Sequence, residues 1–164
     1  MGRVLVTYYS ASGGTRGAAE AIASVLSERG AAVDCATLGE ARDVEGYDAF
    51  VIGAPVNGFR WRPEALAFVE LHRAVLAGKP TGLFLLSIMY GLGRPSARRR
   101  ALSFLDPALA LLPRAKAGYF GGTMQGPAPW PLRLAFGVKK DAPLDSRDWP
   151  AIKAWAAEFA KELA

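Results

Sequence analysis

The residues best suited to chemistry in this sequence lie at 10–15, where three hydroxyl side chains and two glycines stand close together. The apolar run 4–8 precedes them and an alanine-rich helical pattern at 18–26 follows, so the segment is predicted to join a strand to the start of a helix. Unpaired N–H groups and the helix dipole favour an anion at such a start. Glycines let the backbone approach that anion, and hydroxyls donate hydrogen bonds to it.

The composition of this segment narrows the choice of anion. No lysine follows the glycines, which excludes a nucleoside-triphosphate P-loop, and their spacing differs from the dinucleotide fingerprint G-x-G-x-x-G. A loop with hydroxyls and no cation suits a single terminal phosphate, such as that of FMN. The alternative is an ordinary helix N-cap, which needs one hydroxyl and not three. The predicted phosphate-binding residues are Ser10, Ser12, Gly13, Gly14 and Thr15.

The elements that must position this segment alternate along the chain. Strands are predicted at 3–8, 32–37, 48–53, 81–86 and 114–120, and helices at 15–29, 63–77, 95–111 and 149–163. The runs 49–52 and 83–86 are continuously apolar, as expected of strands that helices cover on both faces. This order predicts an α/β fold with a doubly wound parallel sheet, in a single domain over residues 1–164.

Ligands of such folds bind beyond the carboxyl ends of the strands, at the switch point of the sheet. Two loops there carry aromatic side chains, which are expected to sandwich a flat ring. The alternative is that each aromatic ring packs beneath its own loop. Asn57-Gly58 also predicts a turn. The predicted ring-binding residues are Ala54, Pro55, Val56, Asn57, Gly58, Phe59, Trp61, Ser87, Met89, Tyr90, Gly91 and Gly93.

Positive charge is concentrated in one part of the chain. Residues 71–140 carry eleven Lys and Arg and one acidic residue, within a total net charge of +5. A block this one-sided favours an anionic partner, which could be a lipid headgroup, a nucleic acid or a carboxylate-bearing substrate. The alternative is a solvated, arginine-rich surface.

The connection at 121–146 is longer than compact α/β domains usually carry without a role. Its part 129–140 combines Trp130 and Leu134 with several cations, as an interfacial segment does. We expect it to contact an anionic membrane surface or to close over an apolar substrate. The alternative is a short helix that covers a sheet edge.

Other features argue against several classes of protein. A single cysteine, Cys35, excludes an internal disulfide, and one cysteine with one histidine makes no metal site. No apolar run approaches the length of a membrane span, and no signal peptide is visible. A cytoplasmic location is expected, with peripheral contact at the inner face of the membrane through 129–140. Trp155 is predicted to pack in the core.

The segment 10–15 resembles the phosphate loop of the flavodoxin family, whose pattern is hydroxyl-x-hydroxyl-Gly-x-Thr after the first strand. The stretches 51–54, 68–72, 148–149 and 157–160 are similar to the flavodoxin-type, menaquinone-dependent protoporphyrinogen oxidases of bacteria. The resemblance implies a flavodoxin-like three-layer sandwich, a five-stranded sheet of order 2-1-3-4-5 and a long connection before the last helix. It also implies FMN as cofactor, a membrane-associated quinone acceptor and a place in heme biosynthesis.

Three functions are compared on this basis. The leading hypothesis is an FMN-dependent oxidoreductase that takes hydride from a porphyrinogen and passes electrons to a quinone. No catalytic side chain is named, because the cofactor carries the redox chemistry. The alternative is a flavodoxin-type electron carrier without a substrate of its own. The positive charge argues against this carrier, since such proteins are usually acidic. A third hypothesis is a basic module that has lost its flavin, but nucleic acid is not the expected partner. The oligomeric state is not predicted.

Overall fold

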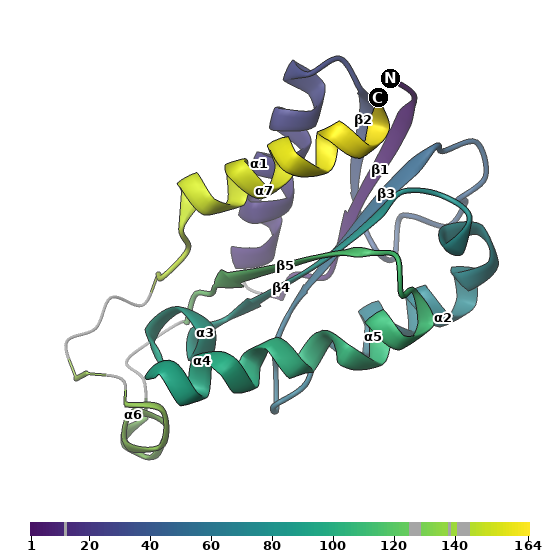
Figure 1. Cartoon of the computed structure of the whole chain (residues 1–164). Helices are drawn as coiled ribbons and strands as arrows, with labels where there is room; N and C mark the ends of the chain where they lie inside the picture. The colour runs from purple at the N-terminus through teal and green to yellow at the C-terminus, as the bar shows by residue number, and fades with distance from the viewer. Residues whose placement is uncertain (12, 125–128, 138, 141–144) are drawn as a thin grey trace.

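The computed structural model describes residues 1–11, 13–124, 129–137, 139–140 and 145–164. They form a three-layer sandwich around a five-stranded sheet of order β2-β1-β3-β4-β5 (Figure 1). Every strand pair in the sheet is parallel. The predicted fold class and strand order are therefore confirmed.

The burial of each strand follows from its place in the sheet. The central strands β1 (Arg3–Tyr8), β3 (Ala49–Pro55) and β4 (Thr81–Ser87) are buried almost throughout. The edge strands are less buried: every residue of β2 (Ala32–Thr37) is exposed or half-buried, and β5 (Lys116–Gly121) mixes half-buried and buried residues. Continuous apolar runs therefore mark the central strands, as expected when helices cover both faces.

Two groups of helices cover the sheet (Figure 1). On one face, α1 (Gly14–Glu28) and α7 (Trp149–Ala160) pack beside each other over a core that includes Ile22, Phe84 and Phe159. The elements on the other face are α2 (Pro63–Ala77), α4 (Pro95–Leu102), the 3-10 turn η1 (Ser103–Leu105) and α5 (Asp106–Leu111). None of the described helices is long and apolar enough to cross a bilayer.

The predicted helix 95–111 is interrupted in the structure. Its pieces are α4, η1 and α5, and Pro107 stands in the first turn of the last piece. A proline has no N–H to donate and its ring collides with the carbonyl four residues earlier, so one continuous helix cannot run through this position. The break leaves Phe104 in η1, close to the carboxyl edge of the sheet.

Two predicted loops contain short helices. In the loop 87–94, α3 (Ile88–Leu92) begins after Ser87, whose Oγ accepts a hydrogen bond from the Tyr90 N–H at 3.2 Å. In the long connection, α6 (Trp130–Phe136) ends at Gly137, whose φ is 69°. Only glycine adopts this left-handed conformation freely, so Gly137 provides the stop.

Trp155 of α7 packs over the sheet at two glycines. A Cβ on Gly82 would lie 2.6 Å from its Cη2 atom, and a Cβ on Gly118 would lie 3.0 Å from its Nε1 atom. The indole Nε1–H donates to the Ala117 carbonyl at 2.9 Å, and the ring stacks against Phe159. The predicted core role of Trp155 is confirmed.

Candidate functional site

A cavity of about 440 Å³ lies at the carboxyl edge of the sheet, where β1, β3, β4 and β5 end. Its lining comes from five segments that are distant in the sequence, as the switch point of a doubly wound sheet predicts. The predicted site residues that line it are Ser10, Gly14, Thr15, Pro55, Val56, Asn57, Gly58, Phe59, Ser87 and Met89.

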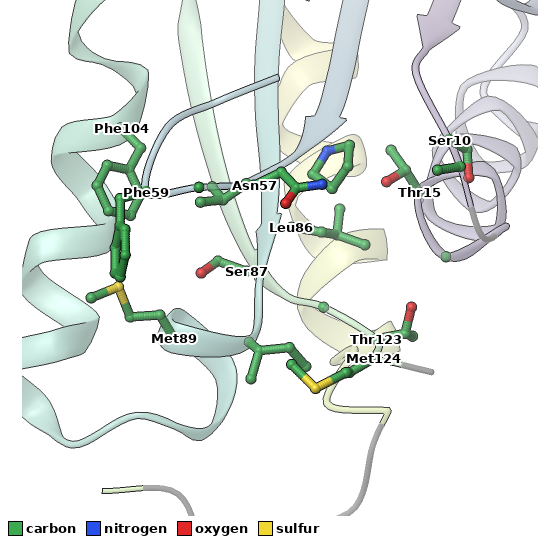
Figure 2. Close-up of a pocket in the computed structure, with 17 residues that line it drawn as sticks. Ser10, Thr15, Asn57, Phe59, Leu86, Ser87, Met89, Phe104, Thr123 and Met124 are labelled. Atoms are coloured by element: carbon green, nitrogen blue, oxygen red, sulfur yellow. The ribbon is translucent and has the colours of Figure 1, made fainter. Parts of the chain in front are cut away.

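One end of the cavity is polar. Figure 2 shows Ser10 and Thr15 there, at the start of α1. The Gly13 N–H donates to the Ser10 Oγ at 2.9 Å, and Gly13 takes a left-handed φ of 87°, which suits glycine. Among the described residues, no side chain caps the helix, and its first turn holds no acidic residue. The amides at the start of α1 are therefore available to an anion. The predicted residue Ser12 lies outside the described residues.

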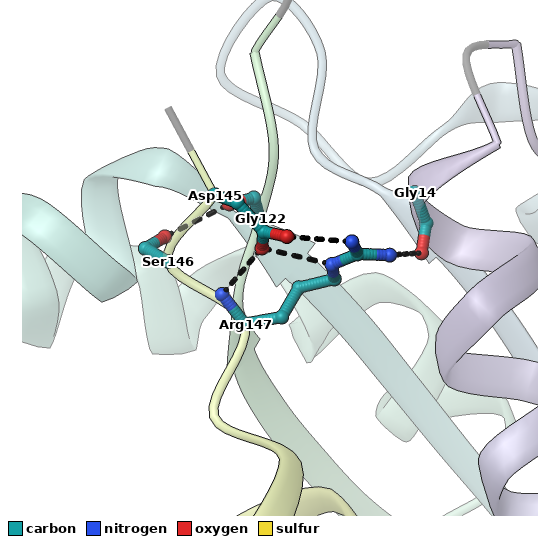
Figure 3. Close-up of polar contacts among 5 residues, drawn as sticks. All are labelled: Gly14, Gly122, Asp145, Ser146 and Arg147. Atoms are coloured by element: carbon teal, nitrogen blue, oxygen red, sulfur yellow. Dashed lines mark hydrogen bonds and ion pairs between the residues drawn. The ribbon is translucent and has the colours of Figure 1, made fainter. Parts of the chain in front are cut away.

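The segment after β5 braces this polar end from the side. Arg147 donates from Nη1 to the Gly14 carbonyl at 3.2 Å and from Nη2 to Asp145 Oδ2 at 2.6 Å (Figure 3). The Ser146 N–H and hydroxyl both donate to the Gly122 carbonyl at 2.9 Å. The Arg147 guanidinium lowers the pKa of the Asp145 carboxyl, mainly through the side-chain hydrogen bonds that it donates to this carboxylate. Because the two opposite charges pair, Arg147 and Asp145 fix the position of the start of α1 and add little net charge to this end of the cavity.

The brace leaves little space between the two segments. A Cβ on Gly14 would lie 2.3 Å from the Oγ1 of Thr123, so only glycine fits there without a shift. Thr123 also pairs with Asp145 in an antiparallel bridge. The first residue of α1 and the wall of the cavity after β5 are therefore packed as one unit.

The other end of the cavity is apolar. Figure 2 shows Phe59, Phe104 and Met89 gathered there, with Asn57 between the two ends. These side chains offer a surface for a flat ring, and the amide of Asn57 can exchange hydrogen bonds with the ring's polar edge. The cavity thus has the polarity of a molecule with a phosphate at one end and an aromatic ring at the other.

A tight hairpin at 56–61 presents Phe59. Val56 and Trp61 form an antiparallel bridge, and the Asn57 N–H donates to the Arg60 carbonyl at 2.9 Å. Gly58 and Phe59 have φ values of 61° and 60°, as in a type I′ turn. The predicted turn is confirmed. A phenylalanine rarely adopts this conformation, so Phe59 is held in a strained geometry beside the cavity.

Two of the predicted ring-binding residues face the core. Trp61 is only 4% exposed, packs against residues of the sheet and α2, and donates from Nε1 to the Phe84 carbonyl at 3.1 Å. The hairpin turns the chain back toward the sheet before residue 61, so Trp61 points inward. Ala54 is fully buried within β3. Neither Trp61 nor Ala54 is part of the lining of the cavity.

The second member of the predicted aromatic pair, Tyr90, also lies away from the cavity. Tyr90 lies in α3 and packs against Tyr119, with the Arg98 guanidinium above its ring at 4.1 Å, so it does not line the cavity. Gly91 packs against the backbone of Gly121 and Gly93 caps α3. The short helix turns these residues away from the cavity. Gly13 contributes its backbone conformation but is not part of the lining either.

The structure adds site residues that the sequence prediction missed. Phe104 lies within a segment that was predicted to be helical. The other added residues are next to predicted positions or follow the edge strand β5. The glycine pair with a hydroxyl at 121–123, directly after the last strand, was the available signal. The added lining residues are Ala11, Leu86, Ile88, Phe104, Gly122, Thr123 and Met124. In the described part of the chain, no three His, Cys, Asp or Glu side chains gather as metal ligands.

Comparisons with known proteins agree with this architecture. A family model described as a flavodoxin domain matches residues 5–127. No curated protein sequence matches this chain. Among solved structures, a short-chain flavodoxin associated with a non-canonical PDU bacterial microcompartment has a TM-score of 0.66 at 14% identity, over 100% of both chains.

Two further structures are full-length flavodoxins. The oxidised flavodoxin 1 from Bacillus cereus has a TM-score of 0.62 at 19% identity, over 100% of both chains. The flavodoxin of Fusobacterium nucleatum bound to flavin mononucleotide has a TM-score of 0.56 at 12% identity, over 98% of both chains. At these identities the likeness concerns the fold.

Proposed function

This chain belongs to the flavodoxin domain family, and on that premise we propose that it is an electron-transfer flavoprotein. FMN is its cofactor, as in the flavodoxin of Fusobacterium nucleatum. When bound, FMN supplies the redox chemistry, because its ring accepts and returns electrons. The observation that carries the proposal is the polarity of the cavity. The start of a helix, to which no described side chain provides a cap, lies at one end, and apolar and aromatic side chains lie at the other.

The residues of the chain divide the work of binding between the two ends. The first amides of α1 and the hydroxyls of Ser10 and Thr15 donate hydrogen bonds to the phosphate. Phe59 and Phe104 would cover the ring and exclude water from it, and Met89 extends this apolar wall on the other side of Phe59. Arg147 and Asp145 hold the start of α1 in place without adding net charge.

The proposal is tested by reconstituting the protein with FMN and titrating it anaerobically with a reductant. A carrier is expected to take up one FMN per chain, to be reduced in two resolved one-electron steps and to reduce a one-electron acceptor. Protein that remains colourless after incubation with excess FMN would overturn the proposal.

A second candidate is an oxidoreductase with its own substrate, of the protoporphyrinogen type with a quinone acceptor. One observation favours it, since Arg100 of α4 lies over Phe59 at the apolar end of the cavity, and this suits an apolar molecule that carries carboxylates. An anaerobic assay with protoporphyrinogen and a menaquinone analogue decides between the two. Turnover supports the enzyme, whereas no turnover by protein that holds FMN and still passes electrons supports the carrier.

A further inference from the structure

We propose that the surface around the apolar end of the cavity docks the carboxylate-rich face of a redox partner protein. This docking face consists of Phe59, Arg98, Arg99, Arg100, Trp130 and Leu134. The proposal rests on the electron-transfer function proposed above, because a carrier must present the exposed edge of its cofactor to a partner. Three features of the face support an acidic protein as that partner.

The first feature is unneutralised positive charge on α4. Arg98, Arg99 and Arg100 are consecutive and exposed in the middle of this helix. The ion pairs within the described residues involve other basic side chains, and none includes an arginine of α4. The sequence from 71 to 140 holds only one acidic residue, Asp106. Such a surface attracts a partner of opposite charge and orients its approach.

The second feature is that two of these charges are held in place by aromatic rings, one of which lines the cavity. The Arg98 guanidinium lies 4.1 Å from the centre of the Tyr90 ring and donates to the Tyr90 hydroxyl at 2.9 Å. The Arg100 guanidinium lies 5.3 Å from the centre of the Phe59 ring, which lines the cavity. Planar guanidinium groups at defined positions suit the paired recognition of carboxylates. Adsorption to a lipid surface needs no such order.

The third feature is an apolar anchor beside the charges. Trp130 and Leu134 are 68% and 72% exposed and stand one turn apart on α6. Arg94 connects this helix to the start of α4, because its Nη2 donates to the Leu134 and Ala135 carbonyls at 2.8 Å. Exposed tryptophan, phenylalanine and arginine side chains in one patch are typical of the residues that dominate protein–protein binding energy.

The test uses decaglutamate as a probe of carboxylate recognition, followed by the amide resonances of the full-length protein with and without FMN. At low salt we expect the resonance changes to centre on α4, α6 and the hairpin 56–61. The double variant R98E/R99E is expected to weaken decaglutamate binding about tenfold or more, because two favourable charges become repulsive. The matched control R29E/R73E reverses two exposed arginines, one directly after the end of α1 and one on α2, and is expected to change binding less than twofold.

The outcomes separate this proposal from the one on which it rests. Resonance changes scattered over the molecule, or equal losses in the two double variants, would overturn the docking face. Binding to phosphatidylglycerol vesicles with no localised response to decaglutamate would overturn it as well and assign the surface to a membrane. FMN uptake is measured separately on the wild type and on every variant. If the wild type does not bind FMN at all, that result contradicts the proposed function and not the docking face.

Discussion

Arg147 donates from Nη1 to the carbonyl oxygen of Gly14 at 3.2 Å, which joins the segment before the last helix to the first residue of α1. The same guanidinium forms two side-chain hydrogen bonds with Asp145 and lies 4.6 Å from the centre of the Trp149 ring. The long connection after β5 therefore returns to the polar end of the cavity, although Arg147 is far from Gly14 in the sequence. Its described part holds the start of α1 in position.

Replacing this arginine tests its positioning role. R147A removes the hydrogen bond to Gly14 and leaves Asp145 without its cation. We expect the Kd for FMN to rise about fivefold, which corresponds to roughly 1 kcal/mol of lost hydrogen bonding. R147K keeps the charge but loses the forked geometry, so it is expected to fall between the wild type and R147A. FMN titration followed by flavin fluorescence measures both.

The control for this substitution is K161A, which removes an exposed ion pair with Glu158 at the other end of α7. It is expected to leave the Kd for FMN unchanged. If R147A binds FMN as tightly as K161A does, the brace does not position the site.

The close contact between Gly14 and Thr123 predicts a second effect. A methyl group at position 14 would lie 2.3 Å from Thr123 Oγ1 and push the segment after β5 away from α1. G14A is therefore expected to weaken FMN binding about tenfold, and G14A/T123A to recover part of that loss because the colliding hydroxyl is gone. G39A is the matched control, since no heavy atom lies within 4 Å of its added Cβ. No recovery in the double variant would contradict the contact as the cause.

The strained backbone of Phe59 predicts opposite effects on stability and binding. Asparagine tolerates a φ of 60° better than phenylalanine does, so F59N is expected to stabilise the FMN-free protein by about 1 kcal/mol. The same change removes an aromatic wall of the cavity and should raise the Kd for FMN. Urea unfolding of the FMN-free protein and FMN titration measure the two effects. A loss of stability in F59N would show that this conformation is not strained.

Cys35 predicts a pH dependence of reactivity. Desolvation by neighbouring atoms, to which the Glu20 carboxylate adds, raises the pKa of the Cys35 thiol from 9.0 to about 11. The side chain reaches solvent on β2, so the scarcity of thiolate limits its reaction and access does not. Iodoacetamide labelling should therefore be slow at pH 8 and rise about tenfold per pH unit toward pH 11. The same labelling of urea-unfolded protein, in which the thiol has its ordinary pKa, gives a reference curve that levels off near pH 9. A folded protein whose labelling rate also levels off near pH 9 would contradict the raised pKa.

The sequence predicted the fold well because the physics that defines it is local. Runs such as 49–52 are apolar at every position, and this pattern is typical of a strand that helices cover on both faces. Glycines and hydroxyls at 10–15 identified the start of α1, whose first residue is Gly14. The break near Pro107 was missed, although a proline inside a helical pattern is a known signal for it.

The site was predicted less completely because its walls depend on chain reversals and on distant segments. Phe59 and Trp61 are two residues apart, yet the hairpin places one beside the cavity and the other in the core. Thr123 and Phe104 reach the cavity only through the arrangement of β5 and η1 around β4. The pattern of neighbouring residues carries no information about such encounters.

The most direct measurement compares the affinities of FMN and riboflavin, which differ only in the phosphate. Because we propose that the first amides of α1 bind that phosphate together with Ser10 and Thr15, FMN is expected to bind at least about a hundredfold more tightly than riboflavin at low salt. S10A/T15A is expected to weaken FMN binding and to leave riboflavin binding unchanged. Equal affinities for the two flavins, or no binding of either, would contradict the assignment of this cavity to FMN.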